Sequence, residues 1–414
     1  MLATARPERS APSEGRVLFL VGAVQFVNAL DFMMVMPLGP DFARALAIPA
    51  SKLGYIGGAY TAAAAVAGLV GMLFLDRFDR RHALAVAMLG LVSGTAAGGF
   101  AQGLPSLLAA RVLAGACGGP AAALSLSIIA DLIPAERRGR ALGAVMGAFS
   151  VASVLGVPLG LEAARLGGWR APFLGTAVLG LIVAAAAIIL LPPFRAHLEA
   201  SPGERPSPPW AMLRRPAVVY ALAAVASVMV AGFAIIPNLS AYLQHNLGYP
   251  REHLGLLYFV GGIVSFVAMR YVGGIVDRRG APRVAAVATL LFVAVLALGF
   301  VRPASWLPVL ALFVGFMVAN SLRAVAMSTL TTRVPGPAER ARFMSTQSAV
   351  QHLAAALGAF LAAAFLGERR DGSLAGMPLV AGVAALLGLL LPVFLWLLSR
   401  RLDADAVEAG SVRD

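Results

Sequence analysis

The chain has 414 residues, of which 59% are hydrophobic and 13% are charged, and it carries a formal net charge of +13. Soluble domains contain about 45–50% apolar and about 25% charged residues, so the composition excludes an ordinary soluble protein and predicts an integral membrane protein. The basic residues lie in short clusters between apolar runs, which is typical of membrane topology and argues against a nucleic-acid partner.

Twelve apolar runs follow a polar N-terminal segment, and each is long enough to cross a bilayer as a helix, which takes about 20 residues. The runs lie at residues 17–39, 52–75, 83–102, 106–130, 141–163, 171–192, 217–243, 254–276, 283–302, 306–331, 342–366 and 378–398. The first run is too long for a signal-peptide core and lacks a convincing small-residue cleavage site, so we interpret it as a retained helix. The sequence therefore predicts an all-α integral membrane protein with 12 transmembrane helices embedded in the lipid bilayer.

A proline-rich polar stretch separates the sixth run from the seventh and predicts a linker between two six-helix bundles. We expect a disordered cytoplasmic N-terminus (1–16), an N-terminal six-helix bundle (17–192), a cytoplasmic linker (193–216), a C-terminal six-helix bundle (217–398) and a cytoplasmic tail (399–414).

Basic residues are unevenly distributed between the two sides of this arrangement. The termini, the linker and the loops after the second, fourth, eighth and tenth runs hold 22 of the 33 lysines and arginines, whereas the opposite loops hold eight. By the positive-inside rule both termini face the cytoplasm. We expect a multi-pass monomer in a bacterial inner membrane.

The two halves repeat each other at their basic loops. "LDRFDRRHAL" follows the second run and "VDRRGAPRV" the eighth, while "PAERRGRALG" and "GPAERARFMS" follow the fourth and the tenth. A parallel duplication joined by a polar linker is typical of two-bundle transporters.

These loops resemble those of the major facilitator superfamily, and the resemblance extends over residues 17–400. The family's loop between helices 2 and 3 reads Gly-x-Leu-x-Asp-Arg-x-Gly-Arg-Arg, and the second copy here, Gly273 to Gly280, fits it better than the first. The first copy keeps four charged residues but has Met72 and Asp79 where the family has glycines. The resemblance implies the major facilitator fold and leaves the turn geometry of the first loop open.

The charged loop residues have two interpretations. An aspartate at a helix end beside arginines can form a charge-assisted network between the bundles, made in one conformation and broken in the other. Alternatively, the arginines only anchor the topology. The candidates for gating are Asp76, Arg77, Arg80, Asp277 and Arg278.

The fifth run, "SVLGVPLGLEAARLGGWRAPF", resembles helix 5 of the family's proton-driven exporters, in which glycine and proline lie close together before a Gly-Trp-Arg-x-x-Phe turn. Gly156 and Pro158 are expected to thin and bend this helix so that it packs closely against the other half, and both are counted among the gating residues. Val157 separates them, a form similar to arabinose-efflux-type exporters. The resemblance favours export and does not identify the exported compound.

Two ionisable residues lie inside apolar runs of the first half. Arg111, with Gly115, resembles the family's Arg-x-x-x-Gly motif, and an arginine inside a membrane needs an anion or a water-filled cavity unless it snorkels to the surface. Asp31 lies about 21 Å from the inner end of the first run and Arg111 at a similar depth. The resemblance implies that helices 1 and 4 are neighbours lining the cavity, so the two can pair. Separation would let Asp31 take up a proton, which makes the pair a candidate proton-coupling site; the alternative is a permanent pair that only fixes helix packing.

Several other polar residues within the runs are candidates for the wall of a substrate cavity. They are Gln25, Asn28, Asn238, Asn320, Gln347, Gln351 and His352. Interhelical hydrogen bonding explains any single one of them equally well. For two further arginines, Arg270 and Arg323, both snorkelling and contact with an anionic group remain open.

The sequence contains no hydrolase motif, phosphate-binding loop or nucleotide-binding cassette, and its five histidines and single cysteine, Cys117, form no metal-ligand pattern. We therefore expect no enzyme, no cofactor and no metal. The sequence predicts a secondary transporter that exports a small organic compound in exchange for protons by alternating access. An uptake symporter or facilitator, and a non-transporting membrane sensor, are the alternatives.

Overall fold

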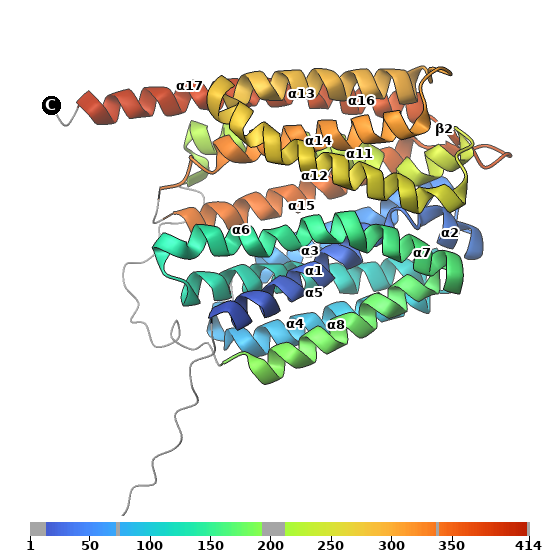
Figure 1. Cartoon of the computed structure of the whole chain (residues 1–414), viewed down its shortest axis with the longest axis horizontal. Helices are drawn as coiled ribbons and strands as arrows, with labels where there is room; N and C mark the ends of the chain where they lie inside the picture. The colour runs from blue at the N-terminus through green and yellow to red at the C-terminus, as the bar shows by residue number, and fades with distance from the viewer. Residues whose placement is uncertain (1–13, 72–74, 193–211, 337–338, 412–414) are drawn as a thin grey trace, which may run out of the picture.

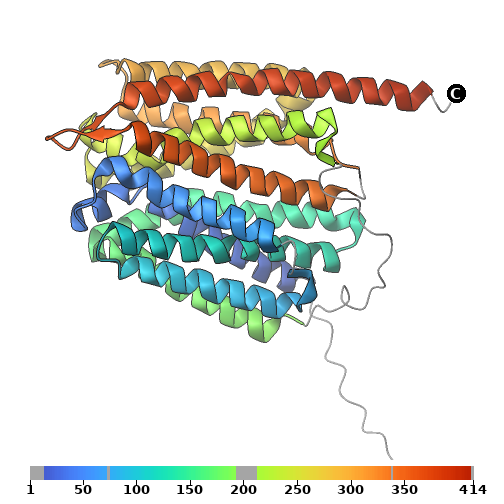
Figure 2. The ribbon, with the colours of Figure 1, turned by 180° about the vertical axis from the view of Figure 1, so that it is seen from behind.

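The computed structural model describes residues 14–71, 75–192, 212–336 and 339–411, and nearly all of them are helical (Figures 1 and 2). The first half contains α1 (Glu14–Val35), α2 (Gly39–Ala45), η1 (Ala50–Lys52), α3 (Leu53–Gly71), η2 (Leu75–Arg77), α4 (Arg80–Gly99), α5 (Leu104–Leu132), α6 (Ala135–Val151), η3 (Ala152–Gly156), α7 (Val157–Gly167) and α8 (Arg170–Leu190). The second half contains α11 (Pro216–His245), η4 (Arg251–His253), α12 (Leu254–Arg279), α13 (Ala281–Leu296), η5 (Ala297–Val301), α14 (Val309–Thr331), α15 (Arg340–Phe365), β1 (Gly367–Glu368), β2 (Leu374–Ala375), α16 (Met377–Gly388) and α17 (Leu390–Ser411).

Twelve of these helical stretches are long and apolar enough to cross a membrane, which confirms the predicted all-α architecture. Their ends differ from those of the apolar runs, most clearly near the two ends of the chain. The first run continues to residue 39, but α1 ends at Val35, because Pro37 has no N–H for the next helical turn. At the other end of the chain α17 continues beyond the last apolar residues to Ser411.

The predicted domain boundaries remain a prediction. Residues 193–211 of the expected linker, residues 1–13 and residues 412–414 lie outside the described part of the chain.

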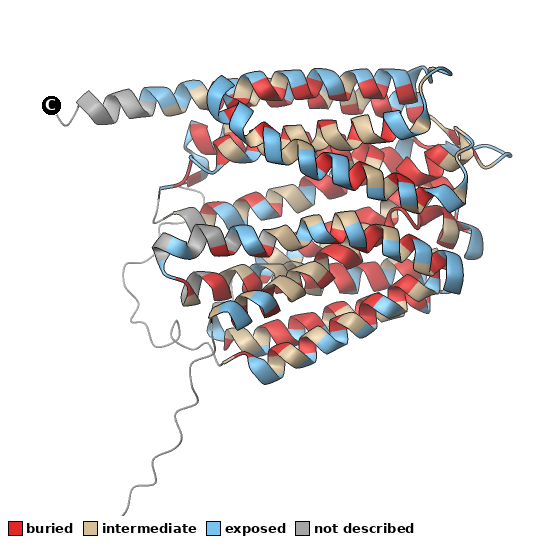
Figure 3. Cartoon of the chain, viewed as in Figure 1, coloured by how far each residue is buried: buried red, intermediate tan, exposed pale blue. Residues whose placement is uncertain are grey.

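The outer surface of the molecule is apolar, as a lipid-embedded protein requires. Large hydrophobic side chains such as Phe19, Val86, Ile189 and Leu386 are 68–76% exposed. Figure 3 shows such exposed positions along the outer helices, with buried positions facing inward. Exposed apolar surface on this scale marks contact with a membrane or a partner.

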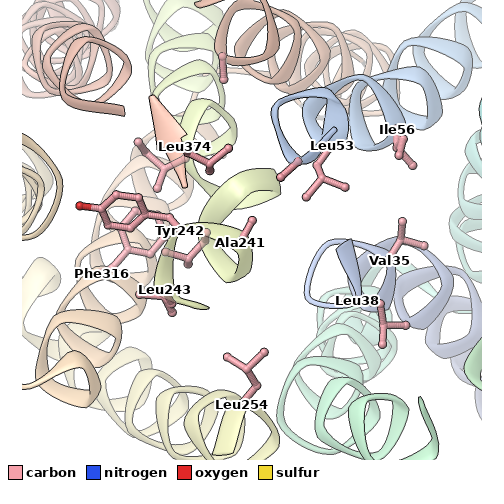
Figure 4. Packing of buried hydrophobic residues seen from close by; sticks show 14 of the residues in the cluster. Val35, Leu38, Leu53, Ile56, Ala241, Tyr242, Leu243, Leu254, Phe316 and Leu374 are labelled. Atoms are coloured by element: carbon pink, nitrogen blue, oxygen red, sulfur yellow. The ribbon is translucent and has the colours of Figure 1, made fainter. Parts of the chain in front are cut away.

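Buried apolar side chains form three cores whose positions define the shape of the molecule. The joint core contains residues from both halves, among them Leu38 and Leu53 of the first half and Tyr242 and Leu254 of the second (Figure 4). The N-terminal core (Val17 to Leu191) contains first-half residues alone, and the C-terminal core (Met212 to Leu398) contains second-half residues alone.

The joint core lies at the end of the molecule away from the two termini. It contains residues from the C-terminal parts of α1 and α11 and from the beginnings of α3 and α12, whereas the other two cores contain the parts of the spans nearer Glu14 and Ser411. The halves therefore share one core at the far end, and each has its own core at the end that carries the termini.

Candidate functional site

Asp31 and Arg111 form a buried ion pair in the middle of the first half. Arg111 Nη1 lies 3.0 Å from Asp31 Oδ2 and 3.2 Å from Oδ1, and Arg111 Nη2 lies 3.2 Å from Oδ1. The two side chains are 0% and 1% exposed, respectively. The predicted contact is therefore present, and Arg111 does not snorkel to the surface.

A third helix contributes a hydroxyl to this pair. Thr95 Oγ1 on α4 lies 2.7 Å from Asp31 Oδ1 and 2.8 Å from the carbonyl oxygen of Leu91. A hydroxyl has one proton, so Thr95 can donate to only one of these acceptors at a time. It can donate to an ionised Asp31, or accept a hydrogen bond from the O–H of a neutral Asp31 while donating to the Leu91 carbonyl.

Aromatic rings enclose the guanidinium of Arg111 on two sides. Its central carbon lies 5.9 Å from the ring centre of Tyr60 on α3 and 5.5 Å from that of Phe173 on α8. A Cβ on Gly98 would lie 3.6 Å from Nη2. Rings attract a desolvated cation through their faces, so the walls stabilise the charge while excluding water.

The Arg-x-x-x-Gly spacing has a steric explanation. A Cβ on Gly115 would lie 2.1 Å from the carbonyl oxygen of Tyr60, and one on Gly119 would lie 2.7 Å from that of Ala64. Glycine at these positions lets α5 contact the backbone of α3, as small residues do in membrane helix pairs. This close approach holds Arg111 beside Tyr60.

The polar face of α1 is used mainly for hydrogen bonds within the first half. Gln25 Nε2 donates to the carbonyl of Ala122 at 3.3 Å, and Asn28 Nδ2 donates to that of Gly118 at 3.0 Å. Tyr60 Oη donates to Asn28 Oδ1 at 2.7 Å. Interhelical bonding thus accounts for the geometry of Gln25 and Asn28, and their contact with a substrate stays a prediction.

The second-half candidates are less fully hydrogen-bonded. Asn238 on α11 is 0% exposed, and neither atom of its amide has a partner among the described residues. On α15, Gln347 is buried with Oε1 unpaired, whereas Gln351 and His352 are half-buried. Asn320 Nδ2 bonds the carbonyl of Phe316, one turn earlier in its own helix. Buried unpaired amides are costly, so Asn238 and Gln347 are the strongest candidates for contact with a ligand.

The fifth span is irregular at the predicted bend. Ala152–Gly156 form a π-helical turn directly before Val157 and Pro158, and such turns occur where a helix accommodates an extra residue, frequently at functional sites. The turn packs against α12 of the other half, since a Cβ on Gly262 would lie 3.2 Å from Val154 Cα.

The charged loop residues are only partly described. The side chain of Asp76 lies outside the described part, Arg77 is exposed and Arg80 is half-buried. Asp277 and Arg278 are exposed near the end of α12, before Gly280, whose φ of +82° favours glycine. The predicted network between the bundles stays a prediction.

The departure of the first loop from the family pattern has a local explanation. Asp79 is the N-cap residue of α4, and its carboxylate accepts a hydrogen bond from the backbone N–H of Arg81 at 3.0 Å. Aspartate at this position therefore stabilises the start of the helix.

Two polar contacts between the halves were not predicted. Arg251 in η4 makes a bidentate pair with Asp41 in α2, with Nε 2.8 Å from Oδ1 and Nη2 2.5 Å from Oδ2, and it also donates to the carbonyl of Leu161. Glu368 of β1 accepts from the backbone N–H of Ala50 at 2.6 Å. We call these two contacts the outer latch, because they lie beside the joint core, at the end of the molecule away from the two termini.

Comparisons with known proteins agree with this architecture. A sequence model of the Major Facilitator Superfamily matches residues 21–283 and 231–412. The chain is 29% identical over 355 residues to the chloramphenicol resistance protein of Streptomyces lividans, covering 85% of this chain and 89% of that protein. It is 28% identical over 299 residues to the purine ribonucleoside efflux pump NepI of Salmonella paratyphi B, covering 70% of this chain and 72% of the pump.

Solved structures show the same fold. A bacterial homologue of the human lysosomal transporter Spinster, in an inward-facing and unoccupied conformation, superposes with a TM-score of 0.75 at 17% identity, over 94% of this chain and 98% of its own. A D-xylose–proton symporter superposes with a TM-score of 0.72 at 16% identity, over 92% and 97% of the two chains. At these identities the likeness concerns the fold alone.

Proposed function

The chain belongs to the Major Facilitator Superfamily, and from this premise we propose that it exports a small organic compound in exchange for protons. That the chain is a transporter and not an enzyme follows from the family and from its relatives. Export is favoured because two curated relatives are named for chloramphenicol resistance and for purine ribonucleoside efflux. These names also suggest the first compounds to test.

The buried pair of Asp31 and Arg111 is the observation that carries proton coupling. Arg111 keeps its proton at any physiological pH, so only Asp31 can change charge. While the two side chains are 3.0 Å apart, the guanidinium and the Thr95 hydroxyl stabilise the ionised carboxylate. A movement of α5 or α4 away from α1 would remove that stabilisation inside a low-dielectric interior, and Asp31 would then take up a proton.

The three cores support alternating access. With both termini in the cytoplasm, the joint core closes the outer end, and the separate N-terminal and C-terminal cores let the halves part at the inner end. We infer that this is an inward-facing state. The opposite state requires the joint core and the outer latch to open. The π-helical turn before Pro158 packs against α12 of the other half, so the fifth span can bend at this contact between the halves.

Substrate contacts are assigned to the space between the halves. Phe32 on α1 and Phe233 on α11 have ring centres 5.8 Å apart, so they meet across the boundary. Asn238 and Gln347 hold unpaired amide atoms in the second half. Aromatic faces with a few amides suit a flat, neutral or weakly polar compound.

Transport in inverted membrane vesicles tests the proposal. We expect labelled chloramphenicol or a labelled purine ribonucleoside to accumulate in vesicles that are acidic inside, and to leak out when an ionophore collapses the pH gradient. A facilitator would equilibrate either compound without responding to the gradient. A symporter would show accumulation with the gradient reversed, and a sensor would move neither.

The outer latch gives a prediction about the balance between states. Asp41→Asn removes the charge from a pair whose side chains are only 17–21% exposed, and hydrogen bonds to charged groups contribute about 1.5–3 kcal/mol. We expect the outward-facing population to rise roughly tenfold, since about 1.4 kcal/mol corresponds to that factor. Labelling of Ser51→Cys in a Cys117→Ala background by an impermeant thiol reagent, added outside the cell, measures it.

Ser51 is a suitable reporter because it is 6% exposed beside the latch and cysteine has nearly its size. Glu14→Gln is the matched control, because Glu14 forms an exposed pair with Arg137, and both residues belong to the first half. Equal labelling rates with and without Asp41→Asn would show that the latch does not hold the outer end closed.

Topology gives a second prediction, which rests on the distribution of basic residues. A peptide tag placed after Asp414 should be protected from antibody and protease in intact cells and become accessible after permeabilisation. A tag inserted between Arg369 and Arg370, in the β1–β2 connection, should behave in the opposite way. Accessibility of the C-terminal tag in intact cells would contradict cytoplasmic termini.

A further inference from the structure

A second arginine is fully buried inside the membrane-spanning region, on the other half of the molecule. Arg323 lies in α14, 0% exposed, and none of its three guanidinium nitrogens has a hydrogen-bond partner among the described residues. It lies 14 residues from Val309 and eight from Thr331, the ends of α14, or about 21 Å and 12 Å along the helix axis. It is buried at this depth, so it does not snorkel.

The groups around Arg323 come from helices on the side away from the first half. Its central carbon lies 4.1 Å from the ring centre of Phe292 on α13, and a Cβ on Gly388 at the end of α16 would lie 3.3 Å from Nη2. Thr289, one turn before Phe292 on the same face of α13, is 1% exposed with an unpaired Oγ1. Thr289 therefore shares a helix face with the ring that contacts the Arg323 cation, and its hydroxyl is free to donate.

No carboxylate of the second half can balance this charge. Between residues 217 and 398 the sequence contains Glu252, Asp277, Glu339, Glu368 and Asp371. Glu252 lies in η4, Asp277 lies near the end of α12, Glu339 directly precedes α15, and the other two lie in or between β1 and β2. Arg111 has Asp31, whereas Arg323 has no equivalent partner among these residues.

The end of α16 compensates only part of the charge. This helix stops at Gly388, and Pro392 lacks the N–H that would bond the Gly388 carbonyl in a continuous helix. A helix C-terminus contributes about half a negative charge. Because arginine cannot lose its proton and an unpaired buried ion is strongly unfavourable, a negative ion from outside the chain would stabilise the remaining positive charge.

We propose that Arg323, with the Thr289 hydroxyl, forms a binding site for a small monovalent inorganic anion of the size of chloride inside the second half. The guanidinium supplies the charge and the N–H groups of three nitrogens, Thr289 supplies a hydroxyl donor, and the absence of a side chain at Gly388 lets Nη2 lie close to the end of α16. Close packing on all sides favours a halide over the carboxylate of a larger compound. The anion belongs to the core of the second half and is not the transported compound.

Thermal unfolding of the purified protein in detergent tests the site without measuring transport. At constant ionic strength, replacing gluconate by chloride or bromide should raise the melting temperature of the wild type by about 3 °C, saturably. Thr289→Val should shift the chloride concentration for half of this effect upward about tenfold, and Arg323→Gln should abolish the effect. Arg270→Gln is the matched control, because Arg270 is exposed on α12, and it should respond as the wild type does.

Wild-type protein alone can overturn the proposal, even if Arg323→Gln does not fold. Equal melting temperatures in chloride and gluconate would show that the end of α16 and the ring of Phe292 are enough to stabilise the charge of Arg323 without an anion. The site is equally contradicted if Thr289→Val leaves the halide response unchanged, or if bromide soaked into crystals gives no anomalous signal beside the guanidinium.

Discussion

Asp31→Asn should abolish accumulation driven by a pH gradient, while exchange of substrate across the membrane without a gradient remains measurable. Asparagine has nearly the same shape as aspartate and can still accept a hydrogen bond from Arg111 or Thr95, but it cannot take up a proton. The three-way contact of Asp31 with α4 and α5 can therefore persist. Arg111 then lacks its counter-charge, so some stability should be lost as well. In transport at matched expression, the coupling between proton movement and substrate movement should be what is lost.

Inverted vesicles measure both quantities in one preparation. Gradient-driven accumulation should fall to the level of vesicles without the transporter, and exchange of labelled for unlabelled substrate should continue. Glu162→Gln serves as control, because it also converts a carboxylate to an amide but on the exposed face of α7. Full gradient-driven accumulation by Asp31→Asn would assign Asp31 to helix packing and require another proton carrier.

The fold could be predicted from the sequence because membrane insertion makes one-dimensional patterns decisive. Each span must satisfy its backbone hydrogen bonds within a helix, so apolar length alone predicted twelve helices. The residues at which the helices end were harder to predict from the sequence. Pro37 ends α1 before its apolar run is complete, and the π-helical turn at Ala152–Gly156 depends on packing against α12 as well as on Pro158.

The pairing of Asp31 with Arg111 could be predicted for a similar reason. Depth in the membrane follows from residue number along a helix, so two charges at equal depth on neighbouring helices could be matched. Thr95 was missed because its orientation around α4 decides the contact, and a single hydroxyl in an apolar span gives no signal. Arg323 was left open because its depth alone did not distinguish burial between helices from snorkelling.

The outer latch was missed for a different reason. Asp41 and Arg251 lie 210 positions apart in sequence, one in the short helix α2 after the first span and the other in the turn that begins the eighth. No periodicity relates such segments, and their contact exists only because the halves share the joint core at that end. The sequence indicated no more than two opposite charges, one just after the first span and one just before the eighth.

Arg111→Gln should be the most destabilising single change at the site. It removes the cation and leaves the Asp31 carboxylate at 0% exposure without a counter-charge. Breaking one partner of a buried pair costs about 3–5 kcal/mol. The melting temperature of the purified protein should fall by about 10 °C.

The double variant separates loss of the pair from exposure of an uncompensated charge. Asp31→Asn with Arg111→Gln replaces both ions by amides that can bond each other, so it should recover about half or more of the stability lost in Arg111→Gln. If the stability losses of the two single variants instead add up in the double variant, the two ions contribute no interaction energy. Such a result would contradict both proton coupling through separation of the pair and a packing role of the pair.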